Sequence, residues 1–341
     1  MTTPFSSRVA RSAGARSTHL AETTVNRRQV LTAGAALGAL LSLSAARSRA
    51  SAQTDPPETI AAASDRLQAL GLPEITVTVG ESGVTAPSEI EEGWHLVSVT
   101  AEAPYIAYFD FMQYPDGLDD ETALAQALDA GRNDLAQLDW VYAGGTNSFT
   151  PGEPALFATY LAPGDYHMAA SYYLPEQGSE EIMKLVPLTV TPAGSGTPGA
   201  APAGTPAAAS VADVRLEMTD DFRYLVGPDP VPAGDTLWEI VNTGEHHSHH
   251  VVMSKYPDGT TAQDIVADFT SLYSGTPPAG EPLVAQAIPI GYAALQSGGI
   301  TTLIELDLAP GQSYAVVCFI IDPATGRPHF LDGMVTVFDV A

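Results

Sequence analysis

The segment Tyr114-Pro115-Asp116-Gly117 returns 142 positions later as Tyr256-Pro257-Asp258-Gly259. A second block, Ala162-Pro163-Gly164, returns as Ala309-Pro310-Gly311 at an offset of 147 positions. A third and shorter block, Val335-Thr336-Val337, lies at that same offset from a similar Leu-Thr-Val segment in the first half. Three matched blocks in one order indicate a tandem duplication, and an internal repeat of this kind governs the fold prediction.

Short runs rich in β-branched and aromatic residues surround these blocks, and turn residues close each run. In the first half they are residues 95–100, 155–161 and 165–173, and in the second half residues 236–241, 300–308 and 314–320. A helix-like stretch follows each Tyr-Pro-Asp-Gly block, at 121–130 and 262–272. The pattern predicts an all-β chain of two tandem Greek-key β-sandwiches with short helical insertions between strands.

The first 52 residues have the features of an export signal. Asn26-Arg27-Arg28-Gln29 leads into an apolar stretch at 31–43, and Ala50-Ser51-Ala52 offers small residues for cleavage. This order is typical of a secretory leader that is too short to span a bilayer. The paired arginines favour the twin-arginine type, with a general-secretion leader as the alternative. No cysteine near residue 52 could carry a lipid anchor.

The rest of the chain divides by composition. Residues 191–210 are almost wholly Thr, Pro, Ala, Gly and Ser, a composition typical of a linker. We therefore expect a short N-terminal segment at 53–70, one domain at 71–190 and a second domain at 211–341. No further stretch is long and apolar enough to span a membrane.

The charge balance excludes one class of partner. Of the 14 Lys and Arg residues, 7 precede residue 53, but only one of the 40 acidic residues does. Without the leader the formal charge is therefore 7 − 39 = −32. A surface this acidic repels nucleic acid and anionic lipid. We expect no nucleic-acid partner.

Cys318 is the only cysteine, so the chain forms no internal disulfide. In an exported protein a lone thiol is buried, paired between chains or bound to a metal. Two potential ligands follow it, His329 and Met334, and the histidine-rich segment 246–250 precedes it. One thiolate, two imidazoles and one thioether form the ligand set of a mononuclear copper centre.

The segments Asn242-Thr243-Gly244 and His249-His250-Val251-Val252, followed by Cys318, His329 and Met334, resemble the cupredoxin family over residues 211–341. The resemblance implies one mononuclear type 1 (blue) copper. Carried over residue by residue, its ligands are His249, Cys318, His329 and Met334.

The resemblance also implies a function and a surface. The protein would be an exported carrier of single electrons in the periplasm, at the cell surface or outside the cell. A redox protein would dock near His329, the more exposed ligand, on an apolar rim of Pro328, Phe330 and Leu331. Backbone amides near Asn242 and Phe319 would support the ligands.

Ten residues separate Cys318 from His329, more than in small cupredoxins and closer to copper nitrite reductases. In the alternative interpretation, His329 is an ordinary loop residue and Met334 an ordinary core residue. At the repeat offsets the first half carries none of the four ligands, which predicts that it holds no metal. The residues at those offsets are Ala107, Ser171, Ile182 and Pro187.

An enzyme is not expected. Tandem cupredoxin domains also occur in multicopper oxidases and nitrite reductases, in which a histidine beside the cysteine passes electrons to a catalytic copper. Here the neighbours are Val317 and Phe319, and the chain has only eight histidines in all. Two alternatives to a carrier stay open: a copper-trafficking or storage protein, and a metal-free binding module. A second metal at His246, His247 and His250, the redox partner and the oligomeric state also stay open.

Overall fold

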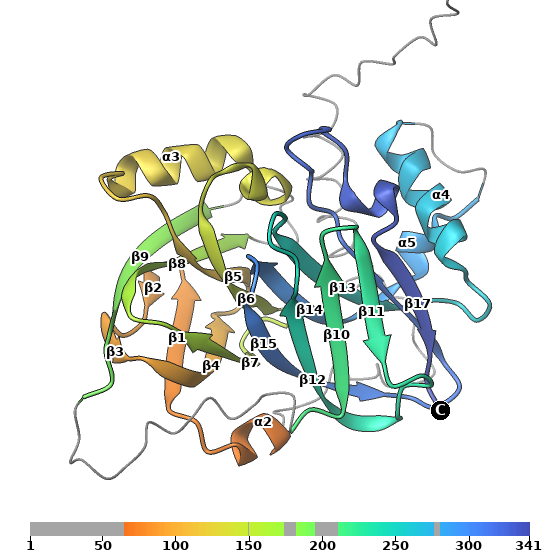
Figure 1. Ribbon diagram of the computed structural model, residues 1–341, viewed down its shortest axis with the longest axis horizontal. Coiled ribbons are helices and arrows are strands. Elements are labelled where there is room, and N and C mark those ends of the chain that lie inside the picture. Colours follow the sequence, from red (N-terminus) through yellow and green to blue (C-terminus); the bar gives the residue numbers. More distant parts are fainter. Residues whose placement is uncertain (1–64, 149, 174–181, 195–210, 276–279) are drawn as a thin grey trace, which may run out of the picture.

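The computed structural model describes residues 65–148, 150–173, 182–194, 211–275 and 280–341 (Figure 1). The predicted leader, residues 53–64 and most of the predicted linker lie outside these ranges. Within them, no helix has the length and apolar character needed to cross a bilayer.

Strands dominate both halves. The first half contains the strands β1 (Glu74–Gly80), β2 (Gly83–Thr85), β3 (Glu89–Glu91), β4 (Gly93–Ala101), β5 (Ile106–Gln113), β6 (Val141–Ser148), β7 (Pro154–Leu161), β8 (Gly164–Tyr173) and β9 (Ile182–Thr191). The second contains β10 (Val214–Thr219), β11 (Arg223–Gly227), β12 (Gly234–Asn242), β13 (His249–Lys255), β14 (Ile288–Gln296), β15 (Thr301–Leu308), β16 (Ser313–Val317) and β17 (Val335–Asp339). The helical elements are α2 (Asp65–Ala69), α3 (Asp120–Ala130), η1 (Arg132–Gln137), α4 (Ala262–Tyr273), α5 (Leu283–Gln286) and η3 (His329–Asp332). The predicted all-β class with short helical insertions is confirmed.

The repeated Tyr-Pro-Asp-Gly block is a turn that starts a helix. In the first half Leu118 N–H donates to the Pro115 carbonyl, and Gly117 has φ 85°. A turn with positive φ at its third position favours glycine. Asp119 then caps α3 by accepting from Thr122 N–H. The second copy has the same turn, and Thr261 and Asp264 form a capping box on α4.

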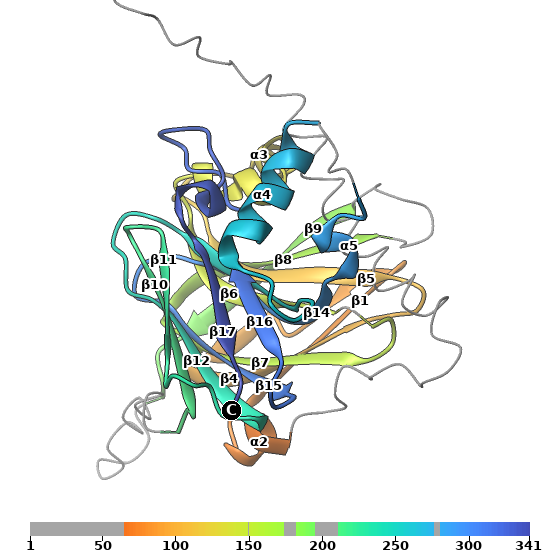
Figure 2. The ribbon, with the colours of Figure 1, turned by 90° about the vertical axis from the view of Figure 1, so that its right-hand side faces the viewer.

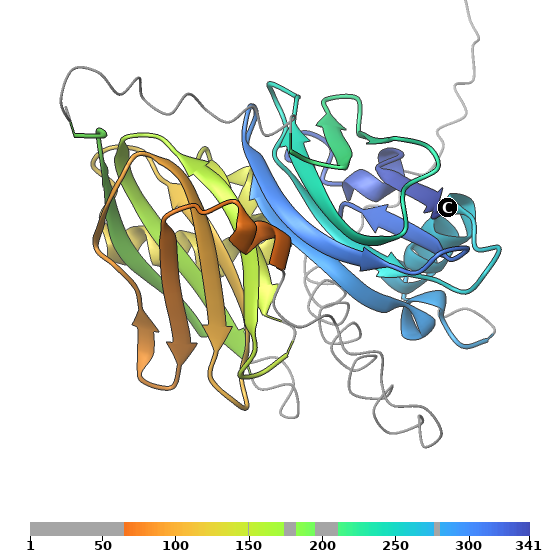
Figure 3. The ribbon, with the colours of Figure 1, turned by 90° about the horizontal axis from the view of Figure 1, so that it is seen from below.

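Two sheets run through both halves. One has the strand order β11-β10-β12-β15-β7-β4-β1-β2, and the other has the order β17-β16-β13-β14-β6-β5-β8-β9-β3. The halves join where β7 pairs with β15 and β6 with β14, both antiparallel. Figure 3 shows the two sandwiches side by side along this seam.

The strand order is symmetric about the seam. From either end of the first sheet inward, the order is a hairpin pair, then one strand (β12 or β4), then the strand at the seam (β15 or β7). The seam strands β7 and β15 differ by 147 positions at both ends, since 301 − 154 and 308 − 161 are both 147. Two copies of one unit related by an approximate two-fold axis would give this order. The duplication itself stays a prediction.

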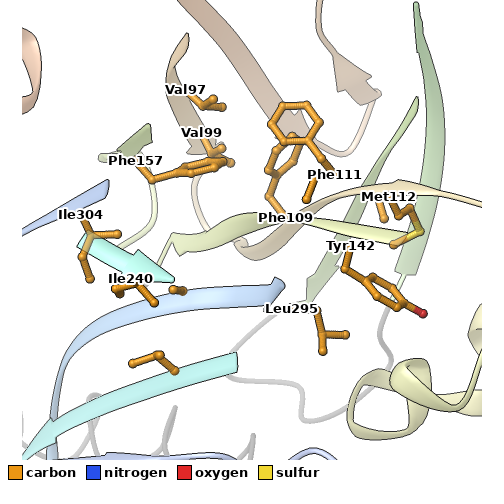
Figure 4. Packing of buried hydrophobic residues seen from close by; sticks show 14 of the residues in the cluster. Val97, Val99, Phe109, Phe111, Met112, Tyr142, Phe157, Ile240, Leu295 and Ile304 are labelled. Carbon is orange, nitrogen blue, oxygen red and sulfur yellow. The ribbon is translucent and has the colours of Figure 1, made fainter. Parts of the chain in front are cut away.

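The core is continuous across the seam. One buried cluster includes Phe109 and Phe157 of the first half with Leu295 and Ile304 of the second (Figure 4). On the outer face of the first sheet, α2 places Leu67 in a smaller cluster that also contains residues of both halves. The halves therefore share apolar burial as well as strand pairing, so the seam contributes to the stability of both.

Candidate metal centre

The predicted ligands come from one end of the second sheet. β13 begins at His249, β16 ends just before Cys318, and β17 begins just after Met334. The register pairs Val252 with Val317 and Val317 with Val335. Because β16 is antiparallel to both β13 and β17, this register places the start of β13, the end of β16 and the start of β17 at the same end of the sheet. In Figures 1 and 2 this end of the sheet lies on the side of the molecule that carries α3 and α4.

The long segment between Cys318 and His329 folds back on itself. Ile321 and Pro328 form an isolated antiparallel bridge, and His329 N–H donates to the Ile320 carbonyl at 2.8 Å. Asp322 closes the tip, since its N–H donates to the Arg327 carbonyl. The extra residues therefore form a compact excursion that returns the chain to Cys318.

Three donor atoms converge below this excursion. Cys318 Sγ lies 3.4 Å from His329 Nδ1, which lies 3.1 Å from His249 Nδ1. The ligand atoms of these three residues all lie within 4.8 Å of one another. The three side chains are buried, with exposed fractions of 0% to 1%.

Met334 is also fully buried. Its carbonyl accepts from Cys318 N–H at 3.2 Å, and its N–H donates to the His329 carbonyl at 3.1 Å. The backbone of Met334 is therefore hydrogen-bonded to two of the three converging residues. Its sulfur as a fourth ligand remains a prediction.

Burial sets the protonation states. It lowers the pKa of His249 to about 2, with a further contribution from His329, and it lowers the pKa of His329 to about 4. Burial also raises the pKa of Cys318 to about 12. At neutral pH both imidazoles are uncharged and have a lone pair to offer. The thiol keeps its proton until a metal ion displaces it.

Three donors face the sulfur of Cys318. The backbone N–H groups of His250 and Ile320 and the Tyr224 hydroxyl hydrogen-bond to it, and each favours the thiolate. The Tyr224 hydroxyl has a single hydrogen, which it shares between this sulfur and the His250 carbonyl. Phe319 N–H donates instead to His250 Nε2 at 2.9 Å, and the backbone amide near Phe319 that supports the sulfur is that of Ile320. His250 is thereby held away from the converging donors.

The histidine-rich loop before β13 is fixed through its backbone. Asp220 accepts from the N–H groups of Glu245, His246 and His247. These hydrogen bonds lower the pKa of Asp220 although its burial opposes the shift. From the other side, Asn242 Nδ2 donates to the His247 carbonyl at 2.7 Å. This hydrogen bond fixes the loop but reaches none of the three converging residues, so support of the ligands by backbone amides near Asn242 stays a prediction.

Phe222 covers the imidazoles. Its ring centroid lies 4.6 Å from that of His329, 4.8 Å from that of His247 and 6.2 Å from that of His249. Phe222 has φ 58° in the turn between β10 and β11, a conformation that costs a bulky residue about 1–2 kcal/mol. Strain of this kind persists where the surrounding structure demands it.

The predicted apolar rim is wrong. Pro328 and Phe330 are buried and Leu331 is half-buried. Phe330 packs against Phe269 and Tyr273 of α4. The exposed fraction is 1% for His329 and 0% for His249, so both ligands are equally buried. The helix α4 therefore covers Phe330, one of the three residues of the predicted rim.

The first half has different residues at the matching places. Ala107 and Ser171 are buried on β5 and β8, and Pro187 lies on β9. Among the residues that the structure describes, the group of three metal-type donors within 4.8 Å is His249, Cys318 and His329.

The three donors fit a copper ion. A soft thiol and two neutral imidazoles that meet in a dry site suit copper, and zinc also accepts this set. Burying these polar groups costs free energy that apolar side chains would not cost. A bound metal offsets that cost.

Several residues of the site carry no recognisable sequence signal. Tyr224, Phe222 and Asp220 belong to the β10–β11 hairpin, whose sequence resembles any polar turn flanked by strands. They reach the site only because β11 and β17 pack against each other, with the Thr336 hydroxyl donating to the Tyr224 carbonyl. Contacts of this kind depend on tertiary structure.

No protein-family model matches the chain, and no curated protein matches it. Among solved structures, the reduced auracyanin of Roseiflexus castenholzii is 21% identical, with a TM-score of 0.26 over 37% of this chain and 94% of that one. The copper nitrite reductase of Nitrosomonas europaea is 12% identical, with a TM-score of 0.20 over 79% of this chain and 93% of that one. Lac15 from a marine microbial metagenome is 12% identical, with a TM-score of 0.21 over 79% of this chain and 67% of that one. At these identities and TM-scores, no likeness identifies the chain.

Proposed function

We propose that the protein is an exported blue-copper protein that carries single electrons through one mononuclear centre in its second half. The observation that supports this most strongly is the meeting of Cys318 Sγ with Nδ1 of His249 and His329 in a buried site. Met334 is the proposed axial ligand. Bound copper would supply a one-electron Cu(II)/Cu(I) couple, tuned by the thioether and by the donors around the sulfur.

The protein's own contribution is a rigid and dry surrounding. The imidazoles are already neutral, and three hydrogen-bond donors favour the thiolate. Because both ends of the 318–334 segment are hydrogen-bonded to the sheet or to each other, the ligands have little freedom to rearrange when the charge changes. Small rearrangement is what a carrier needs for fast transfer.

We propose a carrier rather than a complete oxidase or reductase. Val317 and Phe319, the neighbours of Cys318, offer no imidazole to pass electrons to a second copper. Export is proposed from the leader-like sequence at 1–52, and docking of a redox partner near His329 remains a proposal.

The test is a spectroscopic comparison of copper-loaded wild-type protein with Cys318→Ser. The intense thiolate-to-copper band of the wild type should vanish in the variant, while the circular dichroism spectrum stays the same. A band that survives the substitution would refute the ligand assignment.

Copper trafficking is the second candidate, favoured by the exposed His246 and the half-buried His247 beside the site. The two functions differ in how firmly the metal is held. A carrier cycles between oxidation states without losing copper, whereas a trafficking protein gives up Cu(I) quickly to a competing chelator.

A further inference from the structure

A pocket of ≈ 220 Å³ lies at the seam, directly over the candidate metal centre. Its first-half wall includes Asp139 and Trp140, and its second-half wall includes Glu245, His246 and His247. His329 also lines it. One imidazole thus borders both the pocket and the buried donor group, so the pocket is an approach from solvent to that group.

The pocket has a second connection to the buried group. His329 Nε2 is buried and has no hydrogen-bond partner, although the other nitrogen of the same ring meets Cys318 and His249. An unpartnered buried nitrogen costs free energy unless something occupies the space beside it. His329 lines the pocket, so an occupant of the pocket is in a position to reach this nitrogen.

The chemistry of the lining selects a cation. The carboxylates of Asp139 and Glu245 belong to it, whereas no lysine or arginine does among the side chains that the structure describes. Carboxylates without basic neighbours favour cations and repel anions. The imidazoles of His246 and His247 add nitrogen ligands that first-row transition metals prefer over alkali or alkaline-earth ions.

The potential ligands that line the pocket are less closely grouped than the three buried ligands. Of the residues described, only His249, Cys318 and His329 form a group of three or more such donors within 4.8 Å. Looser ligands imply weaker binding, which suits a site that passes a metal onward. The Asp220 carboxylate nevertheless fixes the backbone of the loop, so His246 and His247 stay beside the pocket.

We propose that this pocket is a capture site for a transition-metal cation, from which copper enters the buried centre. The inference rests on the proposed function, because it takes the buried donors to be the destination. It gives the first half a role, since Asp139 and Trp140 complete the pocket. Residues of both halves therefore form the proposed site.

The experiment uses metal-free full-length protein and Cu(II) alone, with the thiolate-to-copper band followed by stopped flow. The double variant His246→Ala/His247→Ala should reach the wild-type final band, but about tenfold more slowly at low copper. Asp139→Asn should also slow loading, whereas Asp129→Asn, the same change at an exposed position on α3, should not. Loading of the double variant at the wild-type rate would overturn the proposal.

A second measurement separates this proposal from the proposed function. In the Cys318→Ser background no thiolate band can form, so Zn(II) binding is followed by calorimetry. A weak binding event should be present in that background and absent after His246→Ala/His247→Ala is added. If the wild type shows no thiolate band but this weak event behaves as expected, the blue-copper function fails and the capture site stands. If the weak event is missing, or survives the double substitution, the capture site fails.

Discussion

The sulfur of Cys318 lies 3.4 Å from Nδ1 of His329, although the two residues are 11 positions apart along the chain. The intervening segment bridges Ile321 to Pro328 and closes at Asp322, so its length does not separate its ends. A long loop between a thiol and an imidazole ligand is therefore compatible with a compact centre.

Tyr224→Phe should lower the reduction potential of the copper-loaded protein. The hydroxyl hydrogen-bonds to the Cys318 sulfur, and its loss leaves more charge on the thiolate, which favours Cu(II). A hydrogen bond worth about 1 kcal/mol corresponds to about 40 mV for a one-electron couple. Tyr142→Phe is the matched control, because that hydroxyl donates to the Leu135 carbonyl in the first half. An equal shift in both variants would contradict the assignment.

Metal-free protein should lose stability as the pH falls below 6.5. The pKa values of His329 and His249, about 4 and about 2, lie below the ordinary 6.5, so in this range only the unfolded chain takes up these protons. The free energy of unfolding should fall by up to about 1.4 kcal/mol per pH unit for each histidine. The part of this loss of stability that comes from His329 ends near pH 4, because below that pH the folded protein also takes up the proton.

Denaturant unfolding of metal-free wild type and His329→Gln at pH 7 and pH 5 measures this slope. The variant should lose less stability between the two pH values. His167, whose pKa is also lowered by burial, contributes equally to both proteins. Parallel losses would show that His329 titrates normally in the folded state.

Phe222→Ala should speed the removal of copper by a chelator by about tenfold, because the apolar cover of a metal site controls access of solvent. Alanine keeps the Cβ atom and hence the unfavourable φ of 58°, so the change isolates the ring. Phe222→Tyr preserves the ring and should release copper at the wild-type rate. Equal release from all three proteins would mean that the ring does not protect the site.

Gly144→Ala should weaken the seam. Gly144 has φ 86°, and a Cβ there would lie 2.4 Å from Thr302 Cγ2 of the other half. Gly152→Ala is the control, since it has φ 81° but nothing within 4 Å of its Cβ position. The unfavourable φ costs about 1–2 kcal/mol in both, and overpacking adds about 1–3 kcal/mol at Gly144 alone. Equal losses of unfolding free energy would show that the seam tolerates the side chain.

Local sequence patterns predicted the strands and helices well. The runs at 155–161 and 165–173 lie in β7 and β8, and the stretch after each Tyr-Pro-Asp-Gly turn forms a helix. The turn residues, the caps and the alternation of apolar residues act over a few positions, so they can be read from the chain. β16 ends at Val317 rather than at 320, because Cys318 leaves the ladder and bonds to Met334 and Phe330.

The seam and the surface of the site could not be predicted in this way. Pairing of Thr159 with Thr302 joins strands that are 143 positions apart, and no local pattern specifies that partner. The burial of Phe330 depends on α4, which packs against it. The converging residues were predictable because their types are chemically unusual together, whereas Phe222 and Tyr224 are ordinary until the fold places them.

The most direct test of the central claim is the visible absorption spectrum of full-length, metal-free protein during titration with Cu(II). The full chain is required because both sheets and the main core cross the seam. An intense thiolate-to-copper band that saturates at one equivalent is the predicted result. A weak spectrum typical of copper bound by histidine alone would contradict the claim that Cys318, His249 and His329 form a blue-copper centre.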